Sequence, residues 1–129
     1  MTLLPFAAEA PIDHRILAAQ NDDLSGDALL REIAAATLYV PSRDDVREDG
    51  SRFQPVLIVL AGDPYVTVYT ARSRVPADTA PHLLQTAGSH FFRRLPQGYG
   101  VIVNPGYAAQ ILIPPHGVAA FQQDLRRTP

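Results

Sequence analysis

Two segments near the start of the chain have apolar residues at helical spacing. The first covers residues 12–20, and Pro11 before it suits the first turn of a helix. A polar turn follows, after which Ser25 or Asp27 can cap a second helix. The side chains predicted to be buried on that helix are those of Leu29, Leu30, Ile33, Ala34 and Thr37. The pattern therefore predicts two helices before the first strand.

The next apolar segments are typical of strands. Residues 38–40 are rich in β-forming side chains, and we expect this strand to end at Pro41. Residues 56–60 are apolar without interruption, which favours a central strand covered on both faces. Residues 65–70 alternate, with a tight turn expected at residues 62–64 before them. The last two segments are predicted to form an antiparallel hairpin.

An irregular, proline-containing stretch over residues 72–81 leads to a short predicted helix. Gly88 and Ser89 are expected to cap it, and its apolar side chains are Phe91, Phe92 and Leu95.

Two further strands are predicted at residues 100–103 and 109–113. The turn between them is Asn104-Pro105-Gly106, in which proline sets φ at the first central position and glycine tolerates positive φ at the second. After Pro114, a final helix is expected, with Val118, Phe121 and Leu125 forming its apolar stripe.

These elements predict an α+β fold. We expect one domain over residues 1–129, with its core in about 12–125. Its central sheet is expected to be mainly antiparallel, with about five strands, flanked by helices at the N-terminus, in the middle and at the C-terminus. A hydrophobic content of 47% and a charged content of 19% agree with a globular chain.

Charge and cysteine content narrow the classes of partner and compartment. A net charge of -2 provides no basic cluster for nucleic acid or for an anionic membrane. The chain has no cysteine, so it needs no oxidising compartment. No apolar run approaches the ~18 residues of a membrane helix, and the opening residues do not form a signal peptide. The sequence therefore predicts a cytoplasmic protein.

Reactive side chains are scattered along the sequence. The four histidines, His14, His82, His90 and His116, show none of the paired spacing that metal hydrolases use. No serine lies in a strand-to-helix nucleophile motif. We therefore expect no catalytic residue, no cofactor and no metal, and predict that the protein is not an enzyme.

The sequence offers one candidate interaction surface. Tyr65, Thr67 and Tyr69 lie on one face of their strand, and Arg72 and Arg74 follow it. Tyrosine is favoured at interfaces because it is both apolar and able to form hydrogen bonds. The favoured alternative is that a helix covers this face, as is common in a domain with one core.

Several short motifs, taken in order, resemble the SseB N-terminal domain family. The most specific are the Tyr39-Val40-Pro41 strand end, Tyr69-Thr70, and the Asn104-Pro105-Gly106 turn. The resemblance spans approximately residues 12–125. Relatives usually have Phe-Thr-Ser and then an acidic residue, where this chain has Tyr69-Thr70-Ala71 and then Arg72-Ser73-Arg74.

The resemblance implies a non-enzymatic bacterial protein, and different members of the family are linked to serine sensitivity or to accessory roles in secretion systems. Our first hypothesis is an accessory or regulatory factor near a secretion system. We therefore expect a protein-interaction module with a protein partner, and no nucleic-acid or membrane partner. The sequence leaves self-association open. Two alternatives are an immunity-type protein that binds a toxin, and a small-ligand binder or enzyme whose site is assembled only in three dimensions.

Overall fold

The computed structural model describes residues 4–8, 11–21, 24–44 and 54–127. The helices are α1 (Pro11–Gln20), α2 (Gly26–Ala35), α3 (Gly88–Arg94), α4 (Pro115–Arg127) and the short 3-10 helix η1 (Arg72–Arg74). The strands are β1 (Thr37–Ser42), β2 (Leu57–Leu60), β3 (Asp63–Val68), β4 (His82–Ala87), β5 (Gly100–Val103) and β6 (Ile111–Ile113). The predicted α+β class is confirmed.

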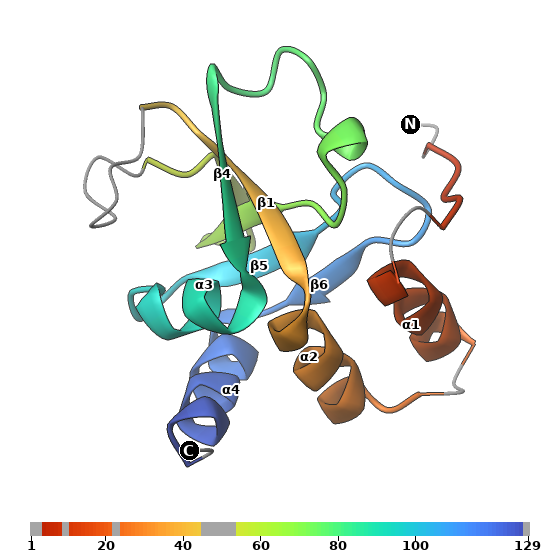
Figure 1. Ribbon diagram of the computed structural model, residues 1–129. Coiled ribbons are helices and arrows are strands. Elements are labelled where there is room, and N and C mark those ends of the chain that lie inside the picture. Colours follow the sequence, from red (N-terminus) through yellow and green to blue (C-terminus); the bar gives the residue numbers. More distant parts are fainter. Residues whose placement is uncertain (1–3, 9–10, 22–23, 45–53, 128–129) are drawn as a thin grey trace.

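The strands form two sheets where one was predicted. β1 and β4 make an antiparallel pair, and the other sheet has the order β2-β3-β5-β6. Within it β3 and β5 are parallel, while the outer pairs are antiparallel. Figure 1 shows the β1–β4 ribbon crossing in front of the four-stranded sheet. The expectation of one sheet of about five strands is therefore wrong in the number of sheets and in the number of strands. The expectation of mainly antiparallel pairing is confirmed, since three of the four strand pairs are antiparallel.

Both errors come from the chain between β3 and β5. Sequence analysis assigned no strand to residues 82–87, which form β4 against β1. Three of the six side chains are part-buried, three are exposed and none is fully buried, so period-two reasoning finds no buried face to detect. η1, β4 and α3 together supply the long connection that a parallel pair of strands requires.

Helices α2, α3 and α4 gather on one side of the four-stranded sheet, as Figure 1 shows. The core between them includes Val66 and Val68 of β3 and Phe92 of α3. The Phe92 ring meets that of Phe121 edge-on, with centroids 5.2 Å apart. The amide of buried Gln122 donates to two carbonyls at the end of α3, which anchors α4 to that helix.

The predicted helices are present, with two corrections at their ends. Ser25 caps α2, because its hydroxyl accepts a hydrogen bond from the amide of Ala28 at 3.2 Å. Thr37 lies beyond α2, as the exposed first residue of β1. α3 has no side-chain cap, and its first residue, Gly88, is buried against α2. The glycine is therefore required by helix contact, whereas the sequence had indicated a capping role.

β1 continues through Pro41, although it was predicted to end there. The amide of Tyr39 donates to the carbonyl of Tyr69, so the backbone groups of Tyr39 point away from β4. Pro41, two residues later, points its nitrogen the same way by strand alternation. The pairing of β1 with β4 therefore loses no donor.

The predicted hairpin of β2 and β3 is confirmed, but its turn lies earlier than expected. The two central residues are Ala61 and Gly62, whose φ angles are 51° and 85°. Two positive φ angles make a type I′ turn, whose twist matches that of the paired strands. Asp63 and Pro64, predicted to be turn residues, begin β3.

No helix in the described ranges is both long enough and apolar enough to cross a membrane.

Candidate functional site

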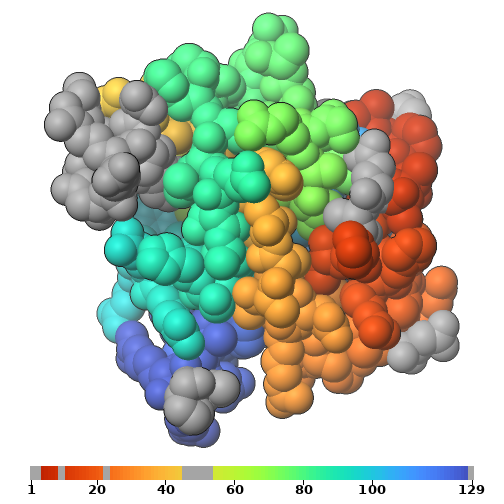
Figure 2. Space-filling view, in the orientation of Figure 1, coloured from red at the N-terminus to blue at the C-terminus, as the bar shows by residue number. Residues whose placement is uncertain are grey.

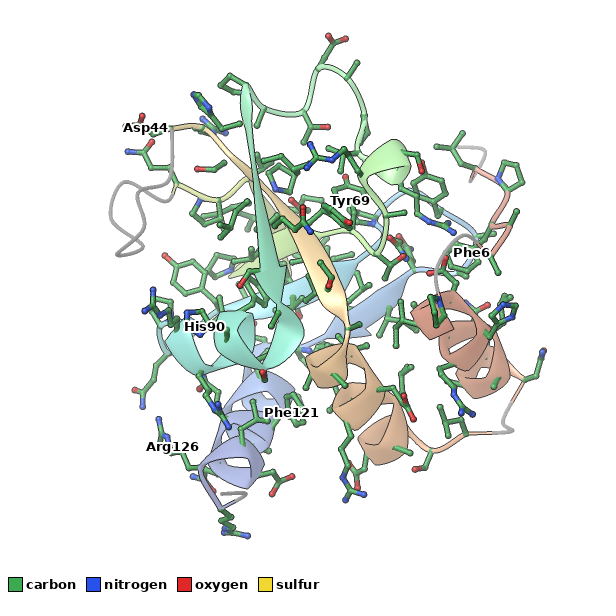
Figure 3. All side chains as sticks on the ribbon, in the orientation of Figure 1. Phe6, Asp44, Tyr69, His90, Phe121 and Arg126 are labelled. Carbon is green, nitrogen blue, oxygen red and sulfur yellow. The ribbon has the colours of Figure 1, made fainter. Side chains whose placement is uncertain are left out.

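Four of the five residues of the predicted interaction surface are buried. Tyr65, Thr67, Tyr69 and Arg74 lie in the interior, and Arg72 is exposed. Figure 3 shows Tyr69 within the body of the molecule. The prediction of an exposed face is therefore wrong for these four residues. The face is covered, as the alternative expected, but Tyr65 contacts Gly100 of β5 and Thr67 bonds to Val56, and neither of these partners belongs to a helix.

The contacts around these buried residues include neighbouring strands. The Tyr65 ring lies over Gly100 of β5, where a Cβ atom would be 2.5 Å from the ring. The Thr67 hydroxyl donates to the carbonyl of Val56 at 3.1 Å. Because Gly100 has no side chain, the Tyr65 ring can pack directly against the backbone of β5.

Four buried polar residues from distant parts of the chain meet at one end of β3 and β5. We call Asp13, Thr70, Arg74 and Asn104 the polar cluster. One Asp13 carboxylate oxygen accepts from the Arg74 guanidinium at 2.7 Å, and the other accepts from the Thr70 hydroxyl at 2.7 Å. The Asp13 and Arg74 side chains are only 0% and 3% exposed. A charge pair this deeply buried requires such hydrogen bonds to offset the loss of hydration.

Asn104 connects the polar cluster to the predicted turn. Its side-chain oxygen accepts from the amide of Thr70 at 3.0 Å, and its side-chain nitrogen donates to the Thr70 hydroxyl at 3.1 Å. The turn itself is confirmed, since the amide of Tyr107 donates to the carbonyl of Asn104 and Gly106 has φ of 85°. Asn104 also has a positive φ, of 56°, a conformation that asparagine tolerates better than most residues.

The histidines and those acidic residues that the structure describes form no metal-binding centre. All four histidines are exposed, and no three metal-ligating side chains come together within the described part of the chain. A depression of about 250 Å³ lies between α1 and α2 and is lined by Pro11, Ile12, Arg15, Glu32, Ala35 and Ala36. Its volume falls below the roughly 300–1,000 Å³ of typical ligand pockets.

The most exposed apolar strand is β2, which had been predicted to be central and covered on both faces. That prediction is wrong, because β2 ends the sheet order and Val59 is 69% exposed. We call Leu57, Val59 and Leu60 the β2 edge. An uninterrupted apolar run does not distinguish a covered strand from an exposed one, so the sequence contained no signal for this surface.

Comparison with known proteins identifies a family that covers most of the chain. The family model described as "SseB protein N-terminal domain" matches residues 14–120. The chain belongs to this SseB N-terminal domain family. The searches of curated proteins and of solved structures found no match for this SseB domain.

The motifs that carried the resemblance adjoin one another in this SseB domain. Tyr39 and Tyr69 exchange two backbone hydrogen bonds of 2.9 Å, which joins β1 to the end of β3. The next residue, Thr70, is bonded to Asn104. Three separate sequence motifs therefore build one junction, with the polar cluster at its centre.

The pH dependence of stability provides a test of this junction. Burial raises the pKa of the Tyr69 hydroxyl above its ordinary value of about 10, and the neighbouring Tyr107 adds to the increase. Above about pH 10 the unfolded state loses this proton first, so the free energy of unfolding falls as pH rises towards the folded pKa. Below about pH 10 the contribution of Tyr69 to the free energy of unfolding is fully present.

We therefore expect Tyr69→Phe to weaken the alkaline loss of stability of the SseB domain. Urea unfolding at a series of pH values from about 8 to 11 measures it, spanning the ordinary tyrosine pKa. Tyr99→Phe, outside the junction, controls for the removal of one hydroxyl. If the free energy of unfolding falls equally with pH in wild type and in Tyr69→Phe, the alkaline loss of stability does not come from Tyr69.

Proposed function

We propose that this SseB domain is a non-enzymatic protein-interaction module that binds an extended strand of a protein partner along the β2 edge. The observation that carries the proposal is an exposed, uncharged strand at the end of the sheet. We propose further, on the family resemblance, that the partner is a bacterial secretion-system or regulatory protein.

Backbone geometry supports strand addition at β2. The carbonyl of Val56 accepts from the amide of Thr67 at 3.2 Å. Backbone groups alternate in direction along an antiparallel strand, so those of Ile58 and Leu60 face β3. Those of Leu57 and Val59 face away from the sheet, where an added strand would bond to them.

The exposed apolar side chains of β2 also favour partner binding at this edge. Leu57, Val59 and Leu60 are three of the five exposed large hydrophobic side chains among the described residues. Edge strands are commonly protected by charged residues or twisted by bulges, and β2 contains no charged residue. Covering these side chains would remove apolar surface from water.

The arrangement of polar groups also supports a role without catalysis. Buried polar side chains converge in the polar cluster, where their charges and hydrogen bonds are directed at one another. An active site instead presents such groups to a substrate.

Val59→Lys tests the β2 edge, because a lysine there opposes the approach of an apolar strand. We expect its folding stability to stay within about 0.5 kcal/mol of wild type, since Val59 is exposed. In quantitative capture from the native host, the partner bound by wild type should be depleted at least about tenfold, a loss of ~1.4 kcal/mol of binding free energy.

Leu112→Lys is the matched control, since Leu112 is 53% exposed on β6 at the opposite edge of the same sheet. It should capture the partner as wild type does. Mixing the recombinant partner with ¹⁵N-labelled chain should then shift the amide signals of Leu57 and Val59. Equal capture by both lysine variants would refute the proposal. Sedimentation showing a wild-type dimer that Val59→Lys dissociates would assign the edge to a second copy instead.

A further inference from the structure

Residues 4–8 lie along the connection between β5 and β6 as an added extended segment. The amide of Leu4 donates to the carbonyl of Gly106 at 2.9 Å, and the carbonyl of Leu4 accepts from the amide of Ala108 at 2.8 Å. These bonds form a parallel bridge between Leu4 and Tyr107. Figure 2 shows the segment as a strip on the surface, in red at the upper right.

An aromatic side chain provides the second attachment of the segment. The Arg74 guanidinium carbon lies 3.9 Å from the centre of the Phe6 ring and 5.5 Å from that of Tyr107. Arg74 also donates to the carbonyl of Ala7. Figure 3 shows Phe6 beside the β5–β6 connection. We call Arg74, Gly106, Tyr107 and Ala108 the segment groove.

Two residues of the groove, Arg74 and Tyr107, are also held by bonds outside the segment. The Tyr107 hydroxyl donates to the carbonyl of Arg74 at 2.9 Å, and Arg74 is held by Asp13. Only Phe6 of the segment packs against the core, because Leu4, Pro5, Ala7 and Ala8 are all exposed. A segment with few buried side chains opens locally at a low free-energy cost, which permits another segment to take its place.

We propose that the segment groove is a docking site for an extended segment of a second protein, which replaces residues 4–8. Two backbone groups and the Arg74 guanidinium recognise the segment, so affinity comes from the main chain and selectivity from the contact between the guanidinium and an aromatic ring. Arg74 already has Asp13 as its counter-charge, which favours an uncharged ring. The partner segment therefore carries an apolar residue, then an aromatic residue two positions later, followed by a small residue.

The chain's own segment then acts as a built-in competitor. A tethered segment occupies its groove at an effective concentration of about millimolar, which lowers the apparent affinity for the same sequence added in trans. This surface is separate from the β2 edge and does not depend on the function proposed for it.

The test uses the full chain and a fluorescent, capped peptide with the sequence of residues 3–8, Leu-Leu-Pro-Phe-Ala-Ala. Phe6→Ala removes the ring from the competing segment, and we expect it to bind the peptide at least about tenfold more tightly than wild type. Fluorescence anisotropy measures the binding. A peptide with alanine in place of phenylalanine should not bind, and one with leucine should bind more weakly because it lacks a π face.

A second variant provides an independent test if Phe6→Ala fails to fold. Leu4→Pro removes the amide that bonds to Gly106 and leaves the segment groove intact. It too should bind the peptide more tightly than wild type. If the folded variants bind no better than wild type, the proposal is overturned, and a dimer formed by exchange of residues 4–8 would assign the groove to a second copy. Adding Val59→Lys to Phe6→Ala should leave peptide affinity unchanged, which separates this test from that of the β2 edge.

Discussion

Replacing Arg74 with methionine is expected to lower the free energy of unfolding by about 3–5 kcal/mol, the usual cost of breaking a buried ion pair from one side. The Asp13 carboxylate, 0% exposed, would lose a counter-charge 2.7 Å away. Methionine retains much of the apolar stem, so the loss reports mainly on charge. For a domain of this size the melting temperature should fall by about 10–20 °C, which thermal unfolding followed by circular dichroism measures.

Two further variants identify the cause of that loss. Arg72→Ala is the matched control from the same 3-10 helix, because Arg72 is exposed and lies 5.7 Å from the Tyr39 ring, and it should cost no more than about 1 kcal/mol. Adding Asp13→Asn to Arg74→Met removes the buried charge while keeping an acceptor for Thr70. The double variant should regain at least ~1 kcal/mol over Arg74→Met. If the losses of stability caused by the two substitutions simply add in the double variant, the burial of an unpaired charge is not their source.

Gly88→Ala is expected to cost about 3 kcal/mol, at the upper end for overpacking of a core. A Cβ atom at Gly88 would overlap the carbonyl oxygen of Ile33 and lie 3.0 Å from the Cα of Ala34. Both obstacles belong to the α2 backbone, so a change of rotamer does not relieve them. The amide of Gly88 also donates to the carbonyl of Ala36 at 2.8 Å, which holds the two helices together. Urea unfolding measures the change in free energy.

Gly26→Ala is the control for Gly88→Ala. Gly26 also begins a helix, and a Cβ atom there would meet nothing within 4 Å. Alanine favours the helix by up to about 1 kcal/mol over glycine, so this variant should be neutral or stabilising. Equal losses at both positions would show that helix propensity, and not the contact between α2 and α3, governs Gly88.

Local sequence patterns predicted most of the helices and turns in this SseB domain. Ser25 as a cap, Pro11 in a first turn, and Pro105 with Gly106 in the second turn each act through their immediate neighbours. Such effects depend on backbone dihedral angles and on nearby hydrogen bonds, which a few adjacent residues determine.

The candidate sites were much less accessible to sequence reasoning. Arg74 looked like a surface cation because arginine is seldom buried, and its partner Asp13 lies 61 positions away. Alternation placed Tyr65 and Tyr69 on one face correctly, yet that face is covered. The apolar run at β2 had the composition of a central strand and lies at an edge.

The amino-acid sequence by itself determined the family, the α+β class and the positions of most helices and turns, because these follow from periodicity and from short-range backbone chemistry. Only the tertiary structure decided the parallel pairing of β3 with β5, the burial of the Asp13–Arg74 pair and the exposure of β2. Alternation along a strand specifies which side chains share a face, but the element packed against that face comes from distant parts of the chain.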